Sequence, residues 1–258
     1  FLYNLETQTA NEIDQGANMD ALDFSPDSST LATAGEDGKL RFWDLDSLEN
    51  INTIENPNSI QAVAYHPDGD QIAVSMHDQV IIWDLASQTQ KTSLDQAGDF
   101  NHIAYSPDGT WLATASSEGA IYLWNAENNY ALARSLLRVN GVPSALEFSP
   151  NGSLLAGGST NAFAYLWDVE LGEEIARLPH TDVVTGVSFS PDGLELATVA
   201  RKSVQIWDIP ALPRTQTDAL IDTACSRLVS NMSQQEWDLI YLGEEYRLIC
   251  PDLTIKER

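Results

Sequence analysis

Positive charge is scarce in this chain. Its 258 residues include 13 Lys and Arg against 38 Asp and Glu, which gives a formal net charge of −25 at pH 7. Nucleic-acid binding depends on Lys and Arg side chains that neutralise phosphates, so this balance argues against DNA or RNA as a partner. The acidic residues are scattered along the chain, which is typical of a solvated surface; a surface for a basic partner is the alternative interpretation.

Cysteine and long apolar runs are also scarce. The two cysteines are Cys225 and Cys250, and their spacing fits neither a zinc site nor a redox Cys-x-x-Cys motif. A cytosolic protein keeps such residues as thiols, although oxidation could join them in a disulfide. Because the chain contains no signal peptide and no apolar stretch of about twenty residues, we expect a cytoplasmic protein without a membrane partner.

What the sequence does contain is a repeat. Five tryptophans each follow a short apolar run and precede Asp or Asn, and successive ones are 40, 41, 43 and 40 residues apart. They are Trp43, Trp83, Trp124, Trp167 and Trp207. A period near forty residues that ends in a Trp-Asp pair is typical of the blades of a β-propeller.

Each repeat predicts the strands of one small antiparallel sheet. An aromatic residue followed by Ser-Pro-Asp-Gly, or a close variant, precedes each tryptophan by 18 or 19 residues. Proline presets a turn, Asp bonds back to the turn backbone and Gly adopts a left-handed conformation, so this motif reverses the chain between two strands. The strand before it alternates apolar with small residues, which suits an innermost strand. A second strand, a polar hairpin and the Trp-bearing third strand follow, with room for a fourth.

These repeats resemble those of the WD-repeat β-propeller family over roughly residues 1 to 209. The resemblance implies an all-β fold of four-stranded antiparallel blades, usually seven in a ring. Tyr3 lies in the tryptophan position of a partial repeat. We therefore expect residues 1–18 to be the end of a truncated blade and residues 19–209 to form five blades. Because open sheet edges invite aggregation, we also expect at least one further blade upstream.

The resemblance also implies a buried hydrogen-bonded tetrad in each blade. Its members are a His before the first strand, a Ser or Thr on the second, an Asp in the hairpin and the Trp. In the last repeat His180, Thr198 and Trp207 match this pattern, but Arg201 and Lys202 replace the hairpin Asp.

The first repeat retains a different part of the tetrad. Asp37, Thr33 and Trp43 match, whereas the His is missing. Because the tetrads are eroded, blade stability should depend mainly on packing. A buried Trp covers roughly 150–250 Å², and its truncation to Ala costs about 3–5 kcal/mol.

Residues 210–258 break the repeat. Apolar residues recur at helical spacing over 220–229, and a capping box spans 233–236. We expect a tail of two short helices packed on the propeller. Residues 218–251 resemble the segment that closes WD-repeat regions of bacterial signalling proteins, namely NACHT-type or apoptotic-ATPase-type NTPases and caspase-like proteases. This resemblance implies a C-terminal sensor that controls an upstream module of the same polypeptide.

No catalytic motif accompanies the repeats. The four histidines fall in different blades without a nucleophile signature, so we expect no enzyme activity in this portion, no cofactor and no metal. Exposed loops on a rigid scaffold carry function instead, which predicts a protein or peptide partner on the propeller face. The candidate contact residues lie near the hairpins and the starts of the inner strands. They are Met76, His77, Phe100, His102, Phe163 and Arg201.

Three alternatives stay open at this point. The propeller could be a constitutive scaffold that holds partners without sensing. It could be a catalytic propeller with a small-molecule or metal site in the central channel. Its acidic surface could also dock a basic peptide, in which case binding would weaken with salt.

Overall fold

The structure, a computed structural model, describes residues 2–4, 8–94, 98–136 and 141–209. These residues all belong to one unit of the chain, residues 1–210. Their secondary structure consists of 21 β-strands, without an α-helix in the described ranges. The expected helical tail at 210–258, with Cys225 and Cys250, lies outside the described residues.

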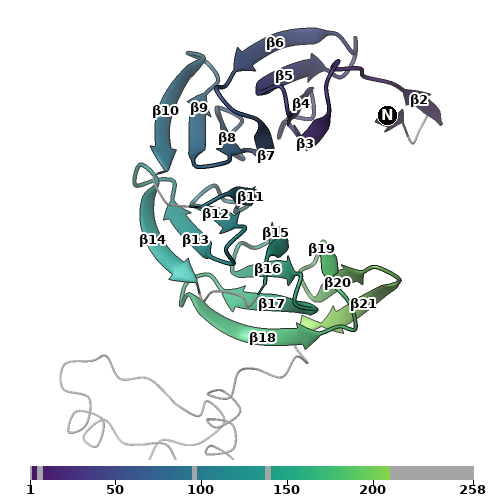
Figure 1. The fold of residues 1–258 in the computed structure, drawn as a ribbon, viewed down its shortest axis with the longest axis vertical. Helices are drawn as coiled ribbons and strands as arrows, with labels where there is room; N and C mark the ends of the chain where they lie inside the picture. The colour runs from purple at the N-terminus through teal and green to yellow at the C-terminus, as the bar shows by residue number, and fades with distance from the viewer. Residues whose placement is uncertain (1, 5–7, 95–97, 137–140, 210–258) are drawn as a thin grey trace, which may run out of the picture. The chain divides into compact units, whose positions relative to one another are not determined.

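Five antiparallel sheets, called blades 1 to 5, follow one another along the chain (Figure 1). Blade 1 contains β3 (Met19–Phe24), β4 (Thr30–Gly35), β5 (Lys39–Asp44) and β6 (Asn50–Glu55). Blade 2 contains β7 (Ile60–Tyr65), β8 (Gln71–Met76), β9 (Val80–Asp84) and β10 (Thr89–Leu94). Blade 3 contains β11 (Phe100–Tyr105), β12 (Trp111–Ser116), β13 (Ile121–Asn125) and β14 (Ala131–Leu136).

The remaining strands complete the described part of the fold. Blade 4 contains β15 (Pro143–Phe148), β16 (Leu154–Ser159), β17 (Phe163–Asp168) and β18 (Glu173–Pro179). Blade 5 contains β19 (Val184–Phe189), β20 (Glu195–Ala200) and β21 (Ser203–Asp208). A separate two-stranded sheet pairs β1 (Leu2–Asn4) with β2 (Thr9–Asn11).

The prediction of an all-β fold made of small antiparallel sheets is confirmed. Blades 1 to 4 each have four strands joined in sequence order, and blade 5 has three strands among the described residues. The first strand of each blade packs against the first strand of the next, from β3 to β19. These five strands are therefore the inner strands (Figure 1).

One strand register recurs in all five blades and explains the repeat. The tryptophan of the third strand pairs with the second residue of the second strand, as in Leu31 with Trp43 and Leu112 with Trp124. The residue two positions further along the second strand is then a diagonal neighbour on the same face, within reach of a long side chain. In blade 1 this residue is Thr33.

The hydrophobic core lies between successive blades rather than in one centre. One buried cluster joins blades 1 and 2, a second joins blades 2 and 3, and a third joins blades 3 and 4. At the first of these junctions Phe42 of β5 meets Tyr65 of β7 edge to face, with ring centroids 6.4 Å apart. Blades 1 to 4 thus each bury their second and third strands against the inner strand of the next blade.

The two end blades expose the faces that the other blades bury. The exposed apolar side chains are Met19, Leu22 and Phe24 on β3 and Val199, Val204 and Ile206 on blade 5. Ile206 is the repeat equivalent of Phe42, and Phe24 is the equivalent of Tyr65. Among the described residues these faces have no neighbouring four-stranded sheet, so packing between blades accounts for the difference in burial.

Candidate functional site

The repeated tryptophans first serve the fold. In three blades a buried threonine of the second strand accepts a hydrogen bond from the indole Nε1, at 2.8, 3.0 and 2.9 Å. These pairs are Trp43 with Thr33, Trp124 with Thr114 and Trp207 with Thr198. The three threonines are fully buried, so in each case the bond satisfies a hydroxyl that is shielded from water.

In blades 2 and 4 the threonine is replaced. Val74 stands in its place in blade 2, and there Trp83 donates instead to Asn56 Oδ1, at 3.3 Å. Gly157 stands there in blade 4, and the Nε1 of Trp167 has no partner among the described residues. The reading of the sequence missed Asn56, although this residue precedes its inner strand by the same four positions as His180 does.

His180 and Asp37, the two other predicted blade residues, have different partners. The Nε2 of His180 lies 2.7 Å from Thr198 Oγ1, and its ring meets Trp207 edge to face. Asp37 stays within its own hairpin, where its carboxylate accepts hydrogen bonds from Lys39 N and from Arg41. The hydrogen bond from Arg41 is the main reason why the pKa of Asp37 is lowered.

In blades 1 to 4 the Asp or Asn after the tryptophan has a role that the sequence reasoning did not assign. Its side-chain oxygen accepts the backbone N–H three residues later, at 2.7 Å for Asp44 and 2.8 Å for Asp84. Asn125 and Asp168 make the same bond. The two residues of the Trp-Asp pair therefore have different structural roles. The indole packs within the sheet, and the Asp or Asn side chain stabilises the turn into the fourth strand.

The Ser-Pro-Asp-Gly turns are held by a second local network. Ser25 Oγ donates to Asp27 Oδ1 at 2.6 Å and accepts from Thr30 N at 2.9 Å. The hydrogen bond from the Ser25 side chain, followed by those from Ser29, lowers the pKa of Asp27. This turn and the one after Trp-Asp lie at the same end of each sheet, which we call the turn face.

The opposite end of the blades carries most of the candidate contact residues. We call it the hairpin face; it consists of the hairpins between second and third strands and the loops that lead into the inner strands. His77 Nδ1 lies 3.0 Å from Asp99 Oδ1, and Arg201 Nε lies 3.9 Å from Asp182 Oδ2. The side chains of His77 and Arg201 are 68% and 73% exposed. These two residues are accessible, as a contact surface requires.

His102 and Phe163 are only partly accessible. Burial lowers the pKa of the His102 imidazole, which therefore favours its neutral form. The Phe163 ring lies beside Tyr165, and the Arg177 guanidinium is 6.0 Å from its centroid. Both side chains are therefore only partly available to a partner.

Met76 and Phe100 correct the expectation from the sequence. Both are fully buried, Met76 in the core of blades 1 and 2 and Phe100 in the core of blades 2 and 3. Their assignment to a partner-binding face was wrong because each lies in a strand and not in a loop. Met76 ends β8 and Phe100 starts β11, so their apolar side chains turn toward the adjacent sheet.

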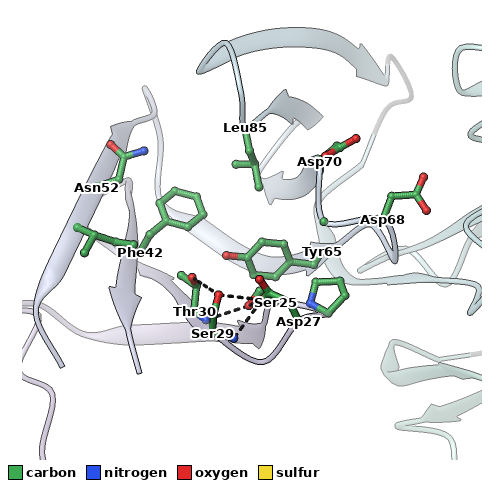
Figure 2. Close-up of a pocket in the computed structure, with 13 residues that line it drawn as sticks. Ser25, Asp27, Ser29, Thr30, Phe42, Asn52, Tyr65, Asp68, Asp70 and Leu85 are labelled. Atoms are coloured by element: carbon green, nitrogen blue, oxygen red, sulfur yellow. Dashed lines mark hydrogen bonds between the residues drawn. The ribbon is translucent and has the colours of Figure 1, made fainter. Parts of the chain in front are cut away.

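A hollow of about 410 Å³ opens between blades 1 and 2 near the turn face (Figure 2). We call it the first groove. Blade 1 contributes Phe42, Ile51 and Asn52, and blade 2 contributes Tyr65 and Leu85. The polar residues at its edge are Ser25, Asp27, Ser29, Thr30, Asp68 and Asp70. The sequence reasoning did not anticipate this groove.

The chemistry available at these sites is that of recognition. Within the described ranges no group of three or more His, Cys, Asp or Glu residues is placed to hold a metal ion. Within the same residues no helix is long and apolar enough to cross a membrane. Exposed charged and polar groups on rigid blades are suited to contacts with another protein.

The family model described as "WD domain, G-beta repeat" matches this chain five times, over more than half of its length. The matched residues are 14–44, 48–84, 88–125, 138–168 and 172–208. Each match ends at the end of a third strand, so the matches are in phase with the repeat.

Similar curated proteins share shorter stretches. A periodic tryptophan protein 2 homolog of Dictyostelium discoideum is 36% identical over 70 residues, which are 27% of this chain and 8% of that protein. Eukaryotic translation initiation factor 3 subunit I of Phaeosphaeria nodorum is 40% identical over 58 residues, 22% of this chain and 17% of the relative. The spindle assembly checkpoint protein bub3 of Schizosaccharomyces pombe is 30% identical over 77 residues, 29% and 24% respectively. The matched stretches span less than a quarter of each relative's length.

Proposed function

Because the chain belongs to the WD40 repeat family, whose members act as protein-interaction scaffolds, we propose that it holds a protein or peptide partner on its hairpin face. One observation carries the proposal. His77 and Arg201 are exposed there, each beside an aspartate of a neighbouring loop, while the repeated Trp, Asp and Ser side chains are used to hold the blades. The names of the relatives agree with such a role, since one is a subunit of a translation initiation factor.

The finer proposal concerns what the interaction controls. We infer that the propeller is non-catalytic, acts in the cytoplasm, and senses a partner or ligand so as to bias an NTPase or protease module of the same bacterial polypeptide between two states. This part rests on the resemblance of residues 218–251 to the closing segment of such signalling proteins. A constitutive scaffold is the alternative, in which partner binding changes no activity.

Site-specific photo-crosslinking tests the contact face. A photo-reactive amino acid at position 77 of the full-length protein, in its native cells, should capture a discrete partner on irradiation. The matched control is the same amino acid at Glu127, which is exposed in a turn at the turn face and does not line the groove between blades 1 and 2. Equal capture from both positions, or capture from position 127 alone, contradicts the proposal.

A second experiment separates the sensor from the scaffold. The nucleotide turnover or proteolysis of the full-length protein should change when the captured partner is added, and the double variant His77→Ala, Arg201→Ala should abolish this response. A partner that binds without changing the activity supports the scaffold. The single variants report whether the two side chains act together.

A further inference from the structure

The junctions between blades differ in what fills the space near the turn face. Between blades 3 and 4 a hollow of about 290 Å³ is lined by Asp108, Asp168 and Glu170, and it contains an arginine of the chain itself. This residue, Arg134, donates from Nη1 to Leu171 O at 2.7 Å. A groove of this construction therefore accommodates a guanidinium beside carboxylates.

The first groove has the same construction without the arginine. Arg134 pairs with Leu123 in the sheet of blade 3, and Asn52 pairs with Phe42 at the equivalent position of blade 1. Both residues line their respective grooves. Because asparagine is much shorter than arginine, the volume at the first groove stays open.

The junction between blades 2 and 3 is closed in another way. The hydroxyl of Tyr130 lies 2.7 Å from that of Tyr105 and donates to Gln71 Oε1 at 2.9 Å. Tyr65 is the equivalent of Tyr105 in the first groove. Tyr65 as a whole is only 7% exposed, yet the Tyr65 hydroxyl has no hydrogen bond to any described residue.

Figure 2 shows the Tyr65 hydroxyl directed toward blade 1, between Phe42 and Thr30. The hydroxyl faces the open first groove and has no hydrogen-bond partner among the described residues, so a donor that enters the groove can bond it. Asp68 and Asp70 lie in exposed positions on the blade 2 rim. Asp27 lies on the blade 1 rim, and the hydrogen bonds that lower its pKa keep it ionised.

We propose that the first groove binds the guanidinium of an arginine carried by an extended segment of a partner protein. The Tyr65 hydroxyl accepts an N–H of the guanidinium, and the Phe42 and Tyr65 rings offer apolar and cation–π contact. The carboxylates of Asp27, Asp68 and Asp70 supply the opposite charge. Arginine suits this combination better than lysine because its planar group stacks on aromatic rings and donates in several directions. The inference deepens the proposed protein-binding function, on which it rests, and adds a second contact surface.

The test uses the full chain labelled with ¹⁵N and a synthetic peptide, acetyl-Ala-Leu-Arg-Leu-Ala-amide. Two matched peptides carry lysine or the neutral isostere citrulline in place of arginine. We expect saturable shifts of the backbone signals of Asn52, Gly69 and Asp70 with the arginine peptide. The citrulline peptide should bind at least about 10-fold more weakly, because it lacks the charge.

Three variants connect the shifts to the groove. Asn52→Arg places in the first groove the side chain that the other groove already has, and it should abolish binding; Asn52→Gln is the matched control and should retain it. Tyr65→Phe should weaken binding about 10-fold, because a hydrogen bond to a charged group is lost. If Asn52→Arg does not fold, as its amide spectrum will show, Tyr65→Phe and the citrulline peptide decide the question.

The outcomes separate this inference from the proposed function. Equal binding of the arginine and citrulline peptides, undiminished binding by folded Asn52→Arg, or shifts confined to the hairpin face each overturn the groove proposal. Capture of a partner from position 77 combined with no shift at the groove leaves the hairpin-face function standing alone. Shifts at the groove combined with no capture from position 77 assign binding to the turn face only.

Discussion

Blades 3 and 4 are neighbours with the same strand register, yet they hold their tryptophans differently. Trp124 donates to Thr114 at 3.0 Å. Trp167 has no acceptor within the described part of the chain, because Gly157 stands where Thr114 stands in blade 3. Instead its ring is stacked on Tyr165, with centroids 5.6 Å apart and planes 11° apart.

The contrast shows what the repeat requires and what it leaves free. Both indoles are buried, with 3% and 1% exposed, so a large apolar ring at this place is common to both blades. The hydrogen bond is not common to both, since blade 4 replaces it with an aromatic stack that the Arg177 guanidinium extends, 5.2 Å from the Tyr165 centroid. Burial of the ring, rather than the tetrad, is therefore the shared element.

Truncation of either ring should have the largest effect. Trp124→Ala and Trp167→Ala should each lower the free energy of unfolding by about 3–5 kcal/mol, because both remove a whole buried indole. Urea denaturation followed by circular dichroism measures the two losses. A loss at Trp167 under about half of that at Trp124 would show that the hydrogen bond, and not burial, dominates.

The blades themselves could be predicted from the sequence because their signals are local. The Pro-Asp-Gly turns, the period near forty residues and the apolar alternation each act within one repeat. The replacements at Val74 and Gly157 are visible in the sequence, but their consequences are not. The fold decides which side chains lie beside each indole. It therefore decides whether the indole donates to a residue such as Asn56, stacks on a tyrosine or has neither partner.

Removal of the hydroxyl in blade 3 should have the next largest effect. Thr114→Val keeps the shape but leaves the buried Nε1 of Trp124 without an acceptor, which should cost about 1–3 kcal/mol. In a Trp124→Phe background the same change should cost much less, because no donor is left to satisfy. A double-mutant cycle measures the difference; an unchanged cost in both backgrounds contradicts the role of the bond.

The candidate site was less predictable than the fold. His77 and Arg201 lie exposed near the hairpins, where the sequence placed them, whereas Met76 and Phe100 were misassigned because their burial depends on a neighbouring blade. The first groove was missed for a related reason. It exists because Asn52 is short where Arg134 is long, and only the strand register makes these two residues equivalent.

The reverse change in blade 4 should have a smaller effect. Gly157→Ser adds a hydroxyl, but its Cβ would lie 3.0 Å from Trp167 Cζ3 and 3.4 Å from Ala145 O. Overpacking costs about 1–3 kcal/mol and a new hydrogen bond returns about 1 kcal/mol, so we expect a net loss of about 1 kcal/mol in urea denaturation. A gain in stability would show that the two ways of holding the ring are interchangeable.

The smallest expected effect concerns the inner strands of the two blades, which should differ in how their stability depends on pH. Blade 4 has Glu147 where blade 3 has Ala104, and its carboxylate accepts hydrogen bonds from Phe189 N and Ser188 Oγ of blade 5. Burial raises the pKa of Glu147, and these two bonds oppose the shift only in part.

A raised pKa means that the folded state keeps its proton to a higher pH than the unfolded state does. This carboxyl therefore has no effect on stability well below its ordinary pKa, and it reduces stability as the pH rises through its folded pKa. Glu147→Gln retains an oxygen acceptor and has no charge to bury. The variant should gain stability relative to the parent as the pH rises above the ordinary Glu pKa of about 4.3, and urea denaturation at a series of pH values measures this gain. A parallel pH profile for Glu147→Gln and the parent would mean that the carboxylate is as well stabilised at the junction as it is in water.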